Sequence, residues 1–283
     1  SMYNIHKLNF FINFKFLRIF LIMIKAIFFD IDGTLVSFNT HKVSNASKIA
    51  IKKLKEKGIK VFIATGRIKL QVDNLDDLEF DGYITANGHD CYVDNKEIYR
   101  NAISKETIYS LIDYLKNKEK FPCSVMTNNG IFINYIDDKV KKLSEGVDIE
   151  IPAIENYFEF VEKNIGNILQ INIFVGEDKE KELMNKVFKD CDSSRWHPAF
   201  ADINSKGGGK HIGVDKIIEY YKIDISETMA FGDGGNDITM IEHCAIGIAM
   251  GNANEKLKKV ADYITDNVDN EGIYKALEHF NLI

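Results

Sequence analysis

Short, largely apolar runs that stop at a polar residue or a glycine recur along this chain, and they constrain its fold more than any other feature. The runs cover residues 26–29, 61–64, 83–86, 229–231 and 245–250. They are continuous rather than alternating, which is typical of strands buried on both faces of a parallel sheet. The residues that follow them directly are Asp30, Thr65, Asn87, Gly232 and Gly251. The pattern predicts buried strands whose carboxyl ends carry polar groups.

Helical patterns separate these runs. Residues 44–57 place Ile49, Ile51 and Leu54 among lysines and stop at Gly58, a residue type that suits the end of a helix. Residues 211–221 also carry apolar side chains at about helical spacing. Strands that alternate with helices predict an α/β fold whose core is a Rossmann-like, doubly wound parallel sheet.

The middle of the chain has a different pattern. Helices are expected over residues 107–116, 157–163 and 179–189, whereas residues 131–135 and 169–175 alternate between apolar and polar side chains. Alternation with a period of two predicts strands with one face exposed to water. Residues from about 104 to 204 are therefore expected to form a small α+β domain inserted into the α/β domain.

Charge and cysteine content argue against several classes of function. The chain has 36 basic and 42 acidic residues and a formal net charge of −6, so no basic field is available to hold a nucleic acid. Its four cysteines are scattered without a CxxC pair, which excludes a thiolate zinc site and argues against a disulfide framework. These features fit a reducing, cytoplasmic location and predict no nucleic-acid partner.

Residues 1–22 form a segment of their own. Ser1 before Met2 is typical of a cloning remnant. The apolar stretch over residues 10–24 is interrupted by charges, and its longest charge-free run, residues 19–24, is far shorter than the roughly 18–20 residues of a membrane span. Three interpretations stay open: an extension upstream of a natural start at Met23, an amphipathic segment on a surface or membrane, and an export signal.

Two carboxylates, Asp30 and Asp32, end the first apolar run within the stretch Asp30-Ile31-Asp32-Gly33-Thr34-Leu35. Side chains two residues apart on a strand can point the same way, and ligand sites of open α/β sheets lie beyond the strand ends. Such close carboxylates repel each other unless a cation or a shared proton compensates, so the motif predicts a hard divalent metal such as Mg²⁺. A solvated turn and a calcium loop are the alternatives, but a calcium loop needs further acidic positions and a flanking helix.

Three more polar elements follow later runs or precede a predicted helix. Thr65-Gly66-Arg67 offers a hydroxyl, backbone amides and a guanidinium to a phosphate. Gly232-Asp233-Gly234-Gly235-Asn236-Asp237 offers further oxygen ligands from Asp233 and Asp237. Its glycine spacing does not match the GxGxxG loop of dinucleotide-binding sites. Lys210 opens the helix predicted over residues 211–221.

These elements, in this order, resemble the haloacid dehalogenase (HAD) superfamily of phosphotransferases. Residues 30–35 match its DxDGT(L/V) motif, Thr65 its second-motif hydroxyl, Lys210 its third-motif lysine and residues 232–237 its GDGxND motif. Lys206 is a second candidate for the lysine. The insertion between the second and third motifs resembles the type IIB cap of the Cof-like sugar-phosphate phosphatases. The resemblance places the cap at residues 104–203 and the catalytic core at residues 23–103 and 204–283.

The resemblance implies a Mg²⁺-dependent phosphatase that hydrolyses small phosphorylated metabolites, chiefly hexose and other sugar phosphates, through an aspartyl-phosphate. It makes Asp30 the nucleophile and Asp32 the general acid and base. Asp30 and Asp32, the latter through its peptide carbonyl, are also implied metal ligands, together with Asp233 and with Asp237 in or near the metal's shell.

The remaining motif positions are implied to handle the phosphoryl group. Thr65 and Lys210 would be catalytic, because they stabilise the charge on its oxygens. Gly66, Arg67 and Asn236 would bind the phosphate or position its partners.

Substrate choice is expected to come from the cap. Asn134, Tyr135, Trp196 and His197 are candidates for contacting the leaving group. Rival functions are a phosphomutase on the same scaffold, a sugar-phosphate sensor without turnover and a nucleotide phosphatase. Arg195 is the only arginine of the inserted segment, whereas a mutase needs several cationic groups there. The complete set of acids argues against a sensor.

Overall fold

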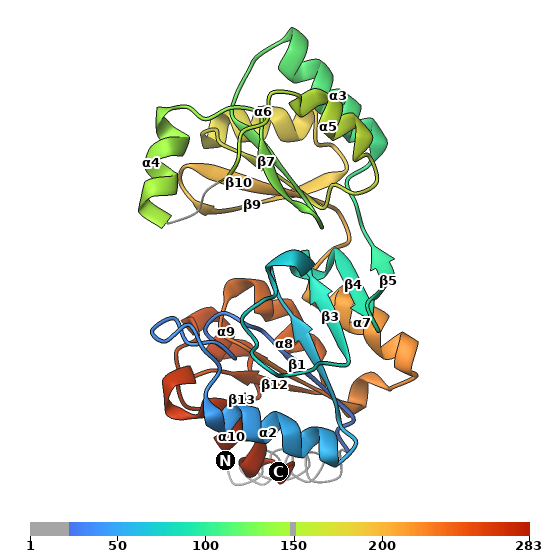
Figure 1. Ribbon diagram of the computed structural model, residues 1–283, viewed down its shortest axis with the longest axis vertical. Coiled ribbons are helices and arrows are strands. Elements are labelled where there is room, and N and C mark those ends of the chain that lie inside the picture. The colour runs from blue at the N-terminus through green and yellow to red at the C-terminus, as the bar shows by residue number, and fades with distance from the viewer. Residues whose placement is uncertain (1–22, 148–150) are drawn as a thin grey trace, which may run out of the picture. The chain divides into compact units, whose positions relative to one another are not determined.

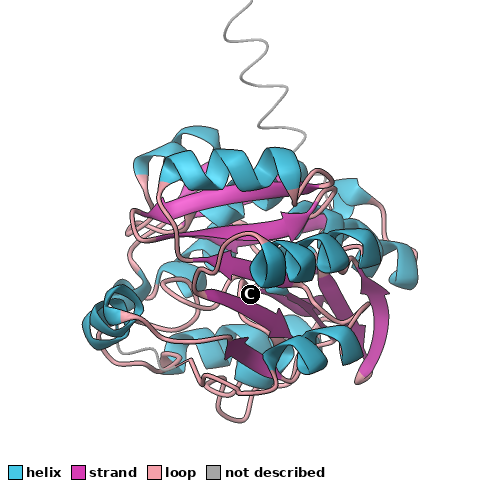
Figure 2. Ribbon diagram, turned by 90° about the horizontal axis from the view of Figure 1, so that it is seen from above, coloured by secondary structure: helices cyan, strands magenta, loops and turns pink. Residues whose placement is uncertain are grey.

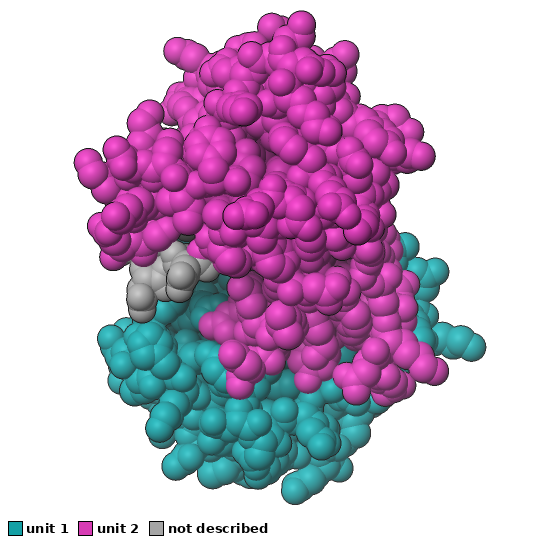
Figure 3. Space-filling view, turned by 45° about the horizontal axis from the view of Figure 1, so that its top comes forward, with its two compact units in different colours: residues 1–64, 74–82, 214–283 teal, residues 65–73, 83–213 magenta. Residues whose placement is uncertain are grey.

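The computed structural model describes residues 23–147 and 151–283, and these form two compact units. The first unit holds the described residues up to 64, together with residues 74–82 and 214–283, and the second holds residues 65–73 and 83–213 (Figure 3). The expectations for residues 1–22 lie outside the described residues. These compact units divide the chain at other points than the domain boundaries expected at residues 103/104 and 203/204. Those boundaries stay a prediction.

A parallel sheet forms the centre of the first unit (Figure 1), and its strands have the order β13-β12-β11-β1-β2. The strands are β1 (Ala26–Phe29), β2 (Lys60–Ala64), β11 (Thr228–Gly232), β12 (Ile246–Ala249) and β13 (Tyr263–Ile264). Every neighbouring pair among them is parallel. All residues of β1, β11 and β12 are buried, so both faces of these strands are covered. The predicted α/β fold with a parallel sheet is confirmed.

Helices of the first unit pack on this sheet and on one another. They are α2 (Asn45–Glu56), α8 (Ile238–His243), α9 (Glu255–Val260) and α10 (Gly272–His279), and α7 (Lys210–Tyr221) starts in the second unit and continues into the first. The α2 helix begins after Ser44, whose side chain accepts a hydrogen bond from the Ser47 N–H, and it ends before Gly58 at φ +77°. Contacts join α10 to α2 and α8 to β11 and β12.

The second unit contains an antiparallel set of three strands that the sequence patterns predicted only in part. They are β3 (Gly82–Thr85), β4 (Asp90–Val93) and β5 (Lys96–Arg100), and Gly82 itself belongs to the first unit. β3 coincides with the predicted strand at residues 83–86, but its partner β4 runs antiparallel. The sequence patterns did not predict β4, which follows at once because a short turn at Ala86–Gly88 (η2) reverses the chain.

A second sheet of the same unit has the strand order β7-β6-β8-β10-β9. Its strands are β6 (Cys123–Thr127), β7 (Gly130–Ile133), β8 (Gln170–Ile173), β9 (Cys191–His197) and β10 (Phe200–Ser205), and all their pairings are antiparallel. Helices α3 (Lys105–Asn117), α5 (Tyr157–Lys163) and α6 (Glu177–Lys186) pack their apolar residues on one face of this sheet. Figure 2 distinguishes the helices from the strands by colour. The predicted helices are confirmed, and the segment has the expected α+β character.

The other face of this second sheet differs from the expectation of a face exposed to water. Ser124, Gln170 and Asn172 point away from the apolar core, yet all three are buried. Leu143 and Ser144 of α4 (Asp138–Val147) line a cavity together with residues of this face, so α4 covers part of it. No helix in the described part of the chain is long and apolar enough to cross a membrane.

Candidate active site

Two neighbouring parallel strands of the first unit deliver acidic residues to one edge of the sheet. Asp30 follows the last residue of β1, and Asp233 follows the last residue of β11. Phe29 lies opposite Phe231 in the pairing, and the Asp30 N–H donates to the Phe231 carbonyl at 3.1 Å. Because both strands run in the same direction, the two carboxylates reach the same edge although 203 positions separate them in the sequence.

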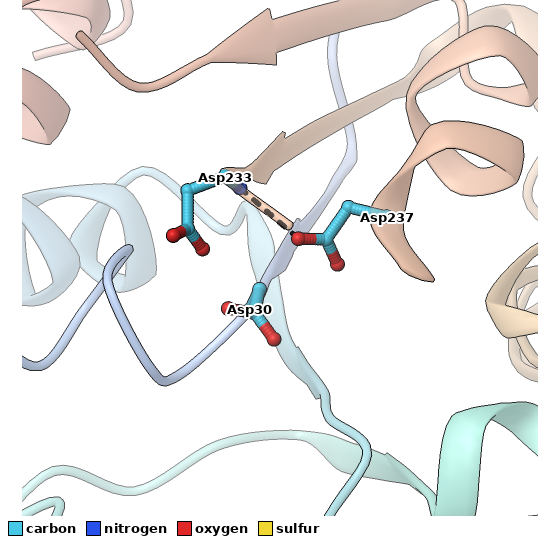
Figure 4. A group of neighbouring side chains, drawn as sticks. All are labelled: Asp30, Asp233 and Asp237. Atoms are coloured by element: carbon cyan, nitrogen blue, oxygen red, sulfur yellow. Dashed lines mark hydrogen bonds between the residues drawn. The ribbon is translucent and has the colours of Figure 1, made fainter. Parts of the chain in front are cut away.

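Asp237 completes a group of three carboxylates with Asp30 and Asp233. One oxygen atom from each of the three lies within 4.8 Å of the others, and Figure 4 shows the side chains around a common space. Asp237 is fully buried, and its Oδ2 accepts the N–H of Asp233 at 3.0 Å and the N–H of Gly234 at 2.9 Å. These bonds hold the turn at residues 233–234 in place.

The charge of this group fits a hard divalent cation. Three carboxylates this close repel one another, and little water can screen the repulsion around Asp30 and Asp237, which are buried. Carboxylate oxygens are the ligands that Mg²⁺ prefers. The donor set on three side chains therefore agrees with the predicted metal.

The loop after β1 closes over Asp233. The Thr34 hydroxyl donates to Asp233 Oδ1 at 3.2 Å. Gly33 has φ +85°, and a Cβ at this position would come within 2.2 Å of Asp233 Oδ2, so only glycine fits. Asp32 is half-buried in the same loop, and its carboxylate is not part of the three-carboxylate group.

Two asparagines that the sequence patterns did not single out support this edge. Asn252 Nδ2 donates to the Gly33 carbonyl at 2.8 Å, while its Oδ1 accepts the Val268 N–H at 2.9 Å. The Asn254 backbone N–H and its Nδ2 donate to the Asp233 carbonyl at 3.1 and 3.3 Å. The sequence signal that could have found them is the stretch Gly251-Asn252-Ala253-Asn254, which follows a predicted strand. Asn254 in this stretch is also a residue type that favours the N-cap of a helix.

Thr65 and Lys210 belong to the second unit, where one turn supports both. The Asn87 N–H donates to the Thr65 carbonyl at 3.0 Å. Gly88 packs against the Gly209 carbonyl. A Cβ added to Gly88 would come within 2.0 Å of that carbonyl oxygen and 3.1 Å of the Lys210 backbone nitrogen. The η2 turn therefore places Thr65 and the first residue of α7 near each other.

The burial of the two candidate lysines separates them. Lys210 is fully buried, whereas Lys206 is exposed and its Nζ donates to the Lys189 carbonyl at 3.1 Å. This difference favours Lys210 as the lysine of the motif. Thr65 is also buried, and its Oγ1 accepts the Arg67 N–H at 3.1 Å, which leaves the hydroxyl proton for a further acceptor.

The other predicted phosphate-binding residues have local contacts. Gly66 and Arg67 are half-buried, and the Arg67 Nη1 donates to the Gln71 carbonyl at 3.0 Å and lies 3.7 Å from the Asp73 carboxylate. In the first unit, Asn236 is exposed. Its Oδ1 lies close to Gly234, so that a Cβ added to Gly234 would be 2.6 Å from this oxygen.

The four candidates for contacting a leaving group differ in their roles. Asn134 is structural, because its Oδ1 accepts the Cys123 N–H and its Nδ2 donates to the Phe121 carbonyl, both at 2.9 Å. Tyr135 is exposed. His197 lines the cavity beneath α4. The side chain of Trp196 lies outside the described part of the chain.

Comparison with known proteins adds independent findings. A family model described as haloacid dehalogenase-like hydrolase matches residues 27–277. YkrA of Bacillus subtilis (strain 168) is 32% identical over 263 residues, with 92% of this chain and 98% of YkrA covered. A solved structure that resembles this chain is BT1666 from Bacteroides thetaiotaomicron, described as a phosphatase of the haloalkanoate (HAD) enzyme superfamily. Its TM-score is 0.84 and its sequence identity is 39%, with 92% of this chain and 96% of that chain covered. BT4131, solved as a HAD subclass IIB sugar phosphatase, has a TM-score of 0.76 and 42% identity, with 92% and 100% covered.

Proposed function

Because the chain belongs to the haloacid dehalogenase-like hydrolase family and is a phosphatase of that superfamily, we propose that it hydrolyses small phosphorylated metabolites, chiefly hexose and other sugar phosphates. The reaction depends on Mg²⁺ and passes through an aspartyl-phosphate. The observation that carries this proposal is the group of three carboxylates at the ends of β1 and β11, with Asp30 at the end of β1.

Two carboxylates of the loop after β1 carry out the bond changes. An oxygen of Asp30 attacks phosphorus, so that an Asp30 O–P bond forms as the ester P–O bond breaks. Asp32 gives its proton to the leaving alcohol and then takes a proton from the water that releases phosphate from Asp30. Asp32 is outside the three-carboxylate group and half-buried, which suits a residue that exchanges protons with the leaving group.

Asp30, Asp233 and Asp237 are the side chains that would hold the metal. The Asp32 carbonyl would be a further ligand. A bound Mg²⁺ neutralises charge on the carboxylates and on the phosphoryl oxygens. The Thr34 hydroxyl orients the Asp233 carboxylate, and the two backbone N–H groups that donate to Asp237 orient the Asp237 carboxylate.

Thr65 and Lys210 stabilise the negative charge that spreads over the phosphoryl oxygens. The Thr65 hydroxyl is oriented for donation by the bond that it accepts from Arg67, and the η2 turn supports the start of α7. Gly66 and Arg67 add backbone and guanidinium donors, and Asn236 assists from the first unit.

The proposed substrate class, cap and location have separate support. The choice of sugar phosphates as substrates is supported by the similarity to BT4131, a sugar phosphatase that is 42% identical to this chain. Residues 104–203 are proposed as the cap and residues 23–103 and 204–283 as the catalytic core. A cytoplasmic location is supported by four buried cysteines that form no disulfide, which suits a reducing compartment.

The test is phosphate release from a panel of sugar phosphates, nucleotides and p-nitrophenyl phosphate, with Mg²⁺ and with EDTA. The matched variant is Asp30→Asn, which keeps the shape of the side chain but is a poor nucleophile. We expect metal-dependent release from the wild-type protein and a loss of at least about a thousandfold in kcat in the variant, because covalent catalysis is removed.

Circular dichroism and the melting temperature check that Asp30→Asn is folded. Activity retained in the folded variant contradicts the assignment of Asp30. No release on the whole panel by a folded wild-type protein that binds Mg²⁺ would instead favour a phosphomutase or a sensor.

A further inference from the structure

A small cavity lies within the second unit, between the sheet of strands β6–β10 and the helix α4. Its volume is about 190 Å³. This is less than the roughly 300–1,000 Å³ of pockets that enclose a drug-sized ligand, so the cavity suits a single ring. Most of its lining is apolar, and its polar residues lie on the sheet except for Ser144 of α4.

A row of three polar side chains crosses the sheet at this cavity. Ser124 on β6 lies opposite Asn172 on β8, and Asn172 lies opposite Asp202 on β10. One position along, Val125, Ile171 and Ile203 form a matching apolar row that belongs to the core under α3, α5 and α6. Alternation along the strands therefore sends the polar row to the opposite face, where Asn172 and Asp202 line the cavity.

Hydrogen bonds fix the direction of this polar row. The fully buried Ser124 hydroxyl donates to Asn172 Oδ1 at 2.9 Å. Because that oxygen is the acceptor, the amide group of Asn172 is oriented, and its Nδ2 donates to Asp202 Oδ1 at 2.6 Å. The row holds a carboxylate, an acceptor when ionised, at the wall of the cavity.

Aromatic rings form another part of the wall. The rings of Phe174 and Phe200 are 5.7 Å apart, and His197 stacks on Phe200 at 5.5 Å with an interplanar angle of 17°. All three residues line the cavity. Flat rings beside a carboxylate suit a ligand that has an apolar face and hydrogen-bond donors at its rim.

The cavity is connected through packing to the phosphate-binding candidates of the same unit. Met126 and Ile131 line the cavity and pack in one apolar cluster with Ile68 and Ala86. Ile68 follows Arg67 in the chain, and Ala86 precedes Asn87, whose N–H donates to the Thr65 carbonyl. One apolar cluster thus joins the cavity wall to the residues next to Arg67 and Asn87.

We propose that this cavity binds the leaving group of the substrate and selects a closed sugar ring over an open chain. The ring places its C–H face on Phe174 and Phe200 and directs hydroxyl donors to Asp202, which the Ser124–Asn172 pair positions. This inference rests on the proposed phosphatase function and adds specificity-determining residues to it.

The charges around the cavity argue against a second phosphate on the leaving group. Among the described residues that line it, none is a lysine or an arginine. The Asp202 carboxylate would repel a second phosphate. We therefore expect sugar monophosphates and not bisphosphates to fit, which disfavours a mutase.

The experiment compares three substrates on the full chain. Glucose 6-phosphate has a ring, sorbitol 6-phosphate has the same carbon chain without one, and acetyl phosphate is too small to fill the cavity. The variants are Asp202→Asn and, as the matched control, Asp192→Asn, which makes the same chemical change at an exposed residue of β9.

We expect wild-type kcat/KM to be at least about tenfold higher for glucose 6-phosphate than for sorbitol 6-phosphate, because the flat wall binds the ring and an open chain loses more rotational freedom on binding. Asp202→Asn should lower kcat/KM for glucose 6-phosphate by about ten- to a hundredfold, the range for a hydrogen bond to a charged group. The change should lie mainly in KM. Acetyl phosphate turnover, and all activities of Asp192→Asn, should stay within about twofold.

Each contrary outcome has a separate meaning. Equal wild-type kcat/KM for the ring and the open chain overturns ring selection, and this measurement needs no variant. An unchanged kcat/KM for glucose 6-phosphate in a folded Asp202→Asn overturns the role of Asp202. Failure of the wild-type protein to hydrolyse even acetyl phosphate contradicts the proposed phosphatase function instead.

Discussion

Individual carboxylates in this protein are buried in two different ways. Asp237 is fully buried, and one of its oxygens accepts two backbone N–H groups. Asp90, also fully buried, accepts one hydrogen bond from the Tyr92 hydroxyl at 2.5 Å, and its Oδ1 has no hydrogen-bond partner. The Arg100 Nε lies 3.9 Å from Asp90 Oδ1. Burial raises the pKa of Asp90 to about 6.

The stability of the protein should depend on pH through Asp90. Its pKa in the folded state lies above the roughly 3.9 of an exposed aspartate, so the folded state binds the proton more tightly than the unfolded state. This stabilisation is full below about pH 4 and is lost as the pH rises through about 6. Asp90→Asn, which resembles the protonated form, should gain up to about 3 kcal/mol relative to wild type between about pH 4 and 7.5.

Urea unfolding of both proteins at several pH values measures this difference. The gain at each pH is the free energy of unfolding of Asp90→Asn minus the free energy of unfolding of the wild-type protein. A difference between the two proteins that stays constant over this pH range contradicts the burial of an ionisable Asp90.

At the scale of elements, two helices of the first unit begin at a residue whose side chain caps them. Ser44 caps α2 with its side chain on the Ser47 N–H, and Asn254 caps α9 with its Oδ1 on the Leu257 N–H at 2.9 Å. Only the α9 cap also reaches the active-site edge, because the Asn254 Nδ2 donates to the Asp233 carbonyl. One asparagine thus starts a helix and supports a candidate metal ligand.

Truncation of the two caps should separate these roles. Ser44→Ala and Asn254→Ala should each lower the free energy of unfolding by about 1 kcal/mol, since each loses one N-cap bond. Only Asn254→Ala should also lower kcat/KM, by about two- to fivefold, through the loss of the weak bond to the Asp233 carbonyl. Urea unfolding and phosphate-release kinetics measure the two effects, and equal activity losses in both variants would contradict a local role for Asn254.

At the scale of the whole molecule, the three carboxylates link the start of the described chain to a turn about 200 positions later. Without a cation their mutual repulsion opposes the packing of the two strand ends. A cation that binds the folded state alone stabilises it by mass action, by about 2.7 kcal/mol at a hundred times its Kd.

Mg²⁺ should therefore raise the melting temperature of the wild-type protein by several degrees. In Asp30→Asn the shift should shrink, while the melting temperature in EDTA should not fall, because one of three repelling charges is removed. Differential scanning calorimetry with Mg²⁺, and with sodium chloride at the same ionic strength as control, measures this. An equal shift with both salts would show only general screening.

Much of the fold could be predicted because its signals are local. The buried runs before Asp30 and Gly232 and the cap at Ser44 act within a few residues, and they correspond to β1, β11 and α2. The antiparallel partner of β3 and the strands β9 and β10 were missed, since polar residues such as Asp192 and Asn204 interrupt their apolar pattern. Their pairing comes from neighbouring strands, which a local pattern does not contain.

The sequence by itself determined the α/β class, the family and the positions of the motifs, because strand ends and glycine-rich turns are encoded by consecutive residues. Tertiary structure alone decided that Asp30, Asp233 and Asp237 converge, that Lys210 rather than Lys206 is buried beside Gly88, and which side chains surround the cavity. The physical reason is that charge repulsion, burial and the Ser124–Asn172–Asp202 hydrogen bonds depend on distances in space. Those distances arise only when strands far apart in the chain are paired.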